Sequence, residues 1–167
     1  MDKKIVEFAL DFEKKGTTVY LELASKVNNP LSKNLFYTLA KQEIEHAERI
    51  EKFSVGLPSE KIAEFVTAGQ VEKDIKKFFE DMKNLSLPDE NNLDVYKTAM
   101  ELEKKGYDAY KKFYGESDNE DERKLLEFLL AEEKGHLDSI ANVYSYLSGT
   151  SDWLEKEESK VWNWMNI

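Results

Sequence analysis

The chain contains an internal repeat, and this repeat limits the folds that it can adopt. Residues 12–24 (FEKKGTTVYLELA) reappear at 102–114 as LEKKGYDAYKKFY. The same offset of 90 residues carries Glu43 and His46 onto an identical glutamate and histidine in the second half. A constant offset, with no slip between the two halves, indicates that one structural unit is used twice.

The repeated unit is a pair of helices. Apolar residues recur at helical spacing over most of the chain, and no segment alternates as a β-strand would. We expect helices over roughly 2–28, 31–54, 91–115 and 119–147, and a further helical stretch within about 59–83. Short links join the first two helices and the last two, so each pair is expected to form an antiparallel hairpin.

Two hairpins predict an all-α four-helix bundle. The chain has 167 residues, which is the length of one domain. We assign residues 1–147 to this domain, as hairpin 1–54, a long and partly helical crossover over 55–90, and hairpin 91–147. For the tryptophan-rich tail, 148–167, we expect a short helix that caps the bundle end or contacts a second chain.

Each expected helix carries a glutamate in the middle of its apolar face. In the second helix, Glu43 and His46 complete a face that is otherwise apolar. An i, i+3 pair projects from one side of a helix, so these two side chains can bind one ion together. The full inward polar set is Glu13, Glu43, His46, Glu103, Glu133 and His136. The residues expected to face solvent beside this set are Glu45, Glu48, Glu132 and Lys134.

Four carboxylates in an apolar core cannot all stay charged without compensation. Each buried ion costs several kcal/mol, which is comparable to the whole stability of a domain. We expect no inward Lys or Arg on these faces, so two divalent cations would balance the four charges. Oxygen-rich ligation with one histidine per metal favours iron or manganese over structural zinc, and the chain has no cysteine.

The charge and hydropathy of the chain argue against several classes of partner. The formal net charge is -10 and no basic patch stands out, which disfavours nucleic acid and anionic lipid. No apolar run approaches the roughly 20 residues that a membrane span requires. The N-terminal segment is amphipathic and lacks the continuous apolar centre of a signal peptide. We therefore expect a cytoplasmic protein.

Each site residue also has a purely structural interpretation. A lone buried histidine is more often held by hydrogen bonds than by a metal, but the only two histidines here occupy equivalent positions beside glutamates. Tyr20 and Tyr110 need no ligand to explain them as core aromatics. Gly16 and Gly106 would each cost about 1 kcal/mol inside a helix, so we expect them to permit close packing near the metals.

The pattern as a whole resembles that of the ferritin-like di-iron carboxylate proteins. The residues that carry the resemblance are Glu13, Glu43-x-x-His46, Glu103 and Glu133-x-x-His136. The E-x6-Y spacing at 13–20 and at 103–110 resembles the rubrerythrin branch in particular. The match spans both hairpins, and a glutamate stands thirty residues upstream of each ExxH motif.

The resemblance implies a centre of two irons, which manganese or zinc could replace in the isolated protein. The implied ligand roles are Glu43 and Glu133 as bridges, Glu13 and Glu103 as terminal ligands, and His46 and His136 each on one iron. Tyr20 and Tyr110 would hydrogen-bond to carboxylates and orient them. Reduced centres of this kind react with peroxide or oxygen.

The chain departs from the rubrerythrin pattern in two ways. Rubrerythrins proper carry a rubredoxin-like module with a four-cysteine iron, whereas this chain has no cysteine and would need an external, rubredoxin-like electron donor. They also carry an extra carboxylate one turn after the helix C ligand, where this chain has Gly106. The residue that takes part in the family's carboxylate exchange is therefore missing.

Three functions remain open from the sequence. The leading hypothesis is a di-iron oxidoreductase that reduces hydrogen peroxide or oxygen. The alternatives are an iron-binding or storage protein of the ferroxidase type and a structural or regulatory bundle that its metals stabilise. The repeated hairpins also favour a homodimer, in which the two chains could exchange hairpins.

Overall fold

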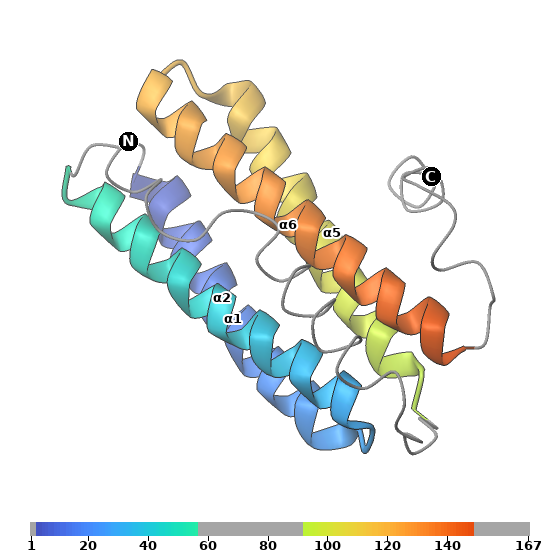
Figure 1. Cartoon of the computed structure of the whole chain (residues 1–167). Coiled ribbons are helices and arrows are strands. Elements are labelled where there is room, and N and C mark those ends of the chain that lie inside the picture. Colours follow the sequence, from blue (N-terminus) through green and yellow to red (C-terminus); the bar gives the residue numbers. More distant parts are fainter. Residues whose placement is uncertain (1–2, 57–91, 149–167) are drawn as a thin grey trace.

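Four α-helices make up the part of the chain that the structure describes, which is residues 3–56 and 92–148 of a computed structural model (Figure 1). They are α1 (Lys3–Lys26), α2 (Pro30–Ser54), α5 (Asp94–Glu116) and α6 (Glu120–Leu147). The four helices expected from the sequence are confirmed, each to within about three residues at its ends. The helical stretch expected at 59–83 and the tail helix lie outside the described residues.

Two asparagines fix where the second helix of each hairpin begins. The Asn29 side chain accepts a hydrogen bond from the backbone N–H of Leu31 at 2.8 Å, and Pro30 occupies the first turn, where its missing N–H costs nothing. In the same way, Asn119 caps α6 by accepting from the N–H of Glu122 at 2.9 Å. These caps end the short links and turn each helix back along its partner.

The two hairpins lie side by side and complete the bundle. In Figure 1, α1 and α2 (blue to teal) form one half, and α5 and α6 (yellow to red) form the other. Across the interface between the halves, α2 faces α6 and α1 faces α5. The end of α2 and the start of α5 lie at opposite ends of the bundle, as a long crossover requires.

Two apolar clusters occupy the two ends of the bundle. The larger is centred on Tyr20, Phe36 and Tyr96, where α1 ends and α2 begins. The smaller includes Leu126 and Leu129, near the start of α6. The inward glutamates and histidines fall between the two clusters along every helix, so apolar layers separate the polar middle of the bundle from both ends.

None of the helices in the described ranges is long and apolar enough to cross a membrane.

Replacing Asn119 by alanine should remove the α6 cap and lower the free energy of unfolding by about 1 kcal/mol, because one backbone N–H loses its acceptor. Urea denaturation of the purified variant measures this change. Asn119→Ser keeps a side-chain acceptor and should retain most of the stability. Equal losses in both variants would contradict the assigned cap.

Candidate metal centre

The polar layer brings together all six residues that the sequence pattern selected. Each is no more than 2% exposed, although four are carboxylates and two are imidazoles. One glutamate comes from each helix, and α2 and α6 each add a histidine one turn later. The six are Glu13, Glu43, His46, Glu103, Glu133 and His136.

Their donor atoms form two overlapping groups of four residues, and a group of three (Glu43, His46 and His136), that could each hold a metal ion. One group of four contains Glu13, Glu43, His46 and Glu133, and the other contains Glu43, Glu103, Glu133 and His136. Within each group, one donor atom from every residue lies within 4.8 Å of the others. Glu43 and Glu133 belong to both groups of four, so each of these carboxylates could contribute to two neighbouring ion positions.

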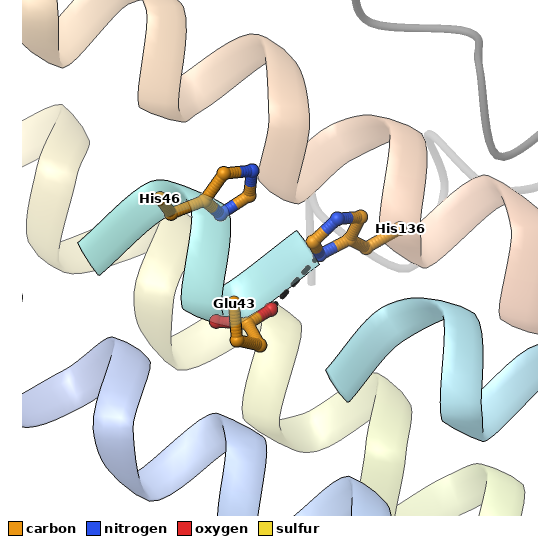
Figure 2. Close-up of side chains that lie close together, drawn as sticks. All are labelled: Glu43, His46 and His136. Carbon is orange, nitrogen blue, oxygen red and sulfur yellow. Dashed lines mark ion pairs between the residues drawn. The ribbon is translucent and has the colours of Figure 1, made fainter. Parts of the chain in front are cut away.

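The two imidazoles turn the same ring nitrogen towards the carboxylates. Nδ1 of His46 lies 3.1 Å from Glu13 Oε2, and Nδ1 of His136 lies 3.2 Å from Glu103 Oε2. His136 Nδ1 also lies 3.2 Å from Glu43 Oε1, the ion pair drawn in Figure 2. The rings stack with centroids 5.2 Å apart and planes 12° apart, so Glu43 lies beside both imidazoles (Figure 2).

In the metal-free protein, the cluster retains protons that compensate its negative charge. Burial, and then the charge of Glu13, raise the pKa of Glu43 to about 8. Burial and the charge of Glu103 raise the pKa of Glu133 well above its usual range. Burial lowers the pKa of His46, but the charge of Glu13, its hydrogen bonds with Glu13 and Glu132 and the charge of Glu43 together outweigh this effect and raise the pKa to about 9.

Glu13 behaves in the opposite way, because its neighbours stabilise the charged carboxylate. Burial raises its pKa, but a hydrogen bond with Glu43 and the charge of His46 together lower it to about 2. The Tyr110 hydroxyl also donates a hydrogen bond to Glu13 Oε1. Glu13 therefore provides a permanent negative charge next to His46.

The donor set fits divalent cations. Oε2 of Glu43 and Oε1 of Glu133 are buried and have no hydrogen-bond partner within the described part of the chain. Buried carboxylate oxygens are rarely left unsatisfied in this way, and both belong to the two residues shared by the groups. Cations at the two positions would satisfy these oxygens and displace the retained protons.

Glycines make room for the two shared carboxylates, as expected. A Cβ added at Gly16 would lie 2.9 Å from Glu43 Oε2, and one added at Gly106 would overlap Glu133 Oε2. The carboxylate of Glu133 thus fills the space beside Gly106, the position at which the rubrerythrin pattern described above has its extra carboxylate. Any side chain at 106 would have to displace Glu133 and the edge of the Phe12 ring.

The two repeat tyrosines differ in what they contact. Tyr110 donates to Glu13, as the sequence led us to expect. Tyr20 is fully buried, but its hydroxyl has no hydrogen-bond partner among the residues described, so it does not orient a carboxylate here. Its ring instead stacks on Phe36 in the larger apolar cluster, with centroids 6.2 Å apart.

Two polar residues near the centre were misjudged from the sequence. Glu132 was expected to face solvent, yet it is only 4% exposed, with Oε2 3.5 Å from His46 Nε2. We also expected no inward Arg, but Arg49 is 3% exposed, with its guanidinium 4.4 Å from the centre of the Phe128 ring. Both lie at the edge of the buried helix face, where α2 packs against α6. The sequence pattern of one helix does not show which residues at this edge the neighbouring helix covers.

Comparison with known families agrees with this geometry. Residues 4–144 match the Rubrerythrin family. The chain belongs to the rubrerythrin family. Rubrerythrins are a ferritin-like di-iron family, so the bundle and its carboxylate–histidine cluster place this member among the ferritin-like di-iron proteins. No curated protein and no solved structure matches the chain.

The metal-free rubrerythrin should lose stability as the pH rises from about 6 to 9. Folding raises the pKa of His46 from 6.5 to about 9 and that of Glu43 from 4.5 to about 8. Both groups bind a proton more tightly in the folded state than in the unfolded state. The stability that they contribute is therefore present at low pH and is lost as the pH rises through the raised pKa values. Urea midpoints in chelator measure the trend.

Bound metal should abolish this loss, because the cations replace the protons and bind better as the ligands deprotonate. Glu43→Gln, which cannot ionise, should reduce the pH dependence of the metal-free protein. A metal-free stability that rises over the same pH range would contradict the assigned proton retention.

Replacing Gly106 by alanine should weaken metal binding, because the new methyl group displaces the Glu133 carboxylate. Gly115→Ala on the same helix is a matched control, since a Cβ there meets nothing within 4 Å and the change should be neutral or stabilising by up to about 1 kcal/mol. Calorimetric titration with Co²⁺ compares the two variants. Equal affinities would show that the close approach at 106 does not matter.

Proposed function

We propose that this rubrerythrin is an oxidoreductase that reduces hydrogen peroxide or dioxygen at a di-iron centre, with electrons from an external donor. The observation that carries the proposal is the pair of overlapping donor groups in the middle of the bundle, with Glu43 and Glu133 common to both. A structural metal site needs no second ion beside it, whereas a pair of adjacent ions would bind both atoms of a reacting unit.

The proposed ligand roles follow the two groups. Glu13 and His46 would hold one iron, Glu103 and His136 the other, and Glu43 and Glu133 would bridge them. When bound, the two irons supply two electrons, which with two protons convert one peroxide molecule into two waters. The chain has no cysteine for a rubredoxin-type site, so the irons would be re-reduced by a separate, rubredoxin-like protein.

The protein surrounding the centre would hold the ligands in place and keep bulk water out. Tyr110 fixes one oxygen of Glu13, and burial, followed by the charge of Glu13, raises the pKa of the tyrosine well above its usual value. Tyr110 therefore stays protonated and continues to donate. The apolar clusters on both sides exclude solvent from the carboxylates, which strengthens their interaction with cations.

The test begins with metal content and reaction rate. The protein should bind two irons per chain, and the reduced protein should be oxidised by hydrogen peroxide within seconds in an anaerobic stopped-flow experiment. Glu43→Ala should remove this reaction, because it takes a ligand from both positions. Glu48→Gln, a change at an exposed position on the same helix, should leave it intact. Oxidation no faster than that of free iron would overturn the proposal.

Gly106 favours a second candidate, which is iron binding of the ferroxidase type without peroxide turnover. The structure leaves no space at this position for the extra carboxylate of the rubrerythrin pattern. This candidate predicts rapid oxidation of Fe²⁺ by dioxygen, little reaction with peroxide, and a large assembly in light scattering. A dimer that turns over peroxide excludes it.

A further inference from the structure

The internal repeat is symmetric in the six candidate ligands but not in the residues behind them. The offset of 90 residues that relates His46 to His136 also relates Gln42 to Glu132, and Arg49 to Ser139. These four are 6%, 4%, 3% and 5% exposed, in that order, so all are buried. One half of the centre therefore has a buried acid and base where the other has two neutral side chains.

The acid lies behind one of the two histidines. Glu132 Oε2 is 3.5 Å from His46 Nε2, while Nδ1 of the same ring is 3.1 Å from Glu13 Oε2. His46 is thus held between two carboxylates, one on each ring nitrogen. A proton kept on Nε2 by Glu132 leaves the Nδ1 lone pair directed into the cluster, where a metal would bind.

The other histidine has no such support. His136 Nε2 is buried and makes no hydrogen bond to the residues that the structure describes. Gln42 occupies the repeat position of Glu132, and its side-chain oxygen likewise has no hydrogen-bond partner there. Among the described residues, a charged group therefore orients one imidazole from behind and not the other.

Arg49 compensates the additional negative charge. It lies on α2, one turn after His46; burial lowers its pKa from the usual value, and the charges of Glu132 and Glu45 oppose this by favouring the protonated guanidinium. The Phe128 ring contacts both residues of α2: the Arg49 guanidinium lies over its face, 4.4 Å from its centre, and the His46 ring is perpendicular to it with centroids 6.0 Å apart. Because Arg49 offsets Glu132, the four ligand carboxylates still require two divalent cations.

We propose that Glu132, with Arg49 as the nearby opposite charge, is a positioning residue for His46 and makes the two metal positions unequal. The position formed by Glu13, Glu43, His46 and Glu133 binds a divalent cation more tightly than the position that contains His136. This inference rests on the ligand roles proposed above. It adds that the centre fills in a fixed order, with the His46 position first.

The test is calorimetric titration of the metal-free full-length protein with Co²⁺, followed in parallel by the visible absorption of the bound ion. Two steps of different affinity are expected. Glu132→Gln should weaken the tighter step about 10- to 100-fold and leave the weaker one nearly unchanged. Glu48→Gln removes the same charge from an exposed position on α2 and should change neither step.

Two histidine variants assign the steps to positions. His46→Ala should abolish the tighter step and His136→Ala the weaker one. Gln42→Glu provides an independent arm if Glu132→Gln does not fold, because it gives His136 a carboxylate of its own and should tighten the weaker step.

The outcomes separate this inference from the proposed function. A protein that binds no Co²⁺ contradicts both. Two equal steps, or two steps that Glu132→Gln weakens equally, overturn the inequality but leave the di-metal centre intact. A tighter step that survives His46→Ala and is lost in His136→Ala assigns the order the other way and also overturns the inference.

Discussion

The fold depends on how four buried carboxylates are compensated. Glu13, Glu43, Glu103 and Glu133 lie together in the centre of the bundle, one from each described helix, at a depth where an unpaired charge would cost more than a domain can lose. Without metal, the pKa values of Glu43, Glu133 and His46 are raised, so these groups keep protons that compensate the negative charge in place of the cations. Glycines beside Glu43 and Glu133 allow the helices to approach closely, and the apolar clusters on both sides provide the hydrophobic stabilisation that makes such a polar layer tolerable.

The repeat gives each position the same kind of ligands, but the side chains around them have diverged. Tyr110 donates to a carboxylate whereas Tyr20 does not, and Glu132 stands where the other half has Gln42. Such differences leave the number of candidate metal-binding side chains unchanged. They alter how strongly the surrounding residues fix the orientation of each one.

Membership of the rubrerythrin family fixes the general chemistry and leaves the particular reaction to the residues of this chain. Gly106 is the most informative of them. In the structure its missing side chain provides the room for Glu133, one of the six residues that could hold metal, so this donor set and the glycine belong together. A carboxylate side chain at this position would force Glu133 to move. In this respect the chain differs from the rubrerythrin pattern, which has an extra carboxylate there.

The sequence alone determined the four helices, their pairing into hairpins and the six residues of the polar layer, because helical periodicity and a constant repeat offset are properties of the chain itself. Only the tertiary structure showed that Glu132 and Arg49 are buried and that the Tyr20 hydroxyl bonds to no carboxylate in residues 3–56 and 92–148. A single helix pattern marks the centre of the buried face, but its flanks become buried or exposed according to the neighbouring helix. That choice is made by packing between α2 and α6, which lie far apart in the sequence.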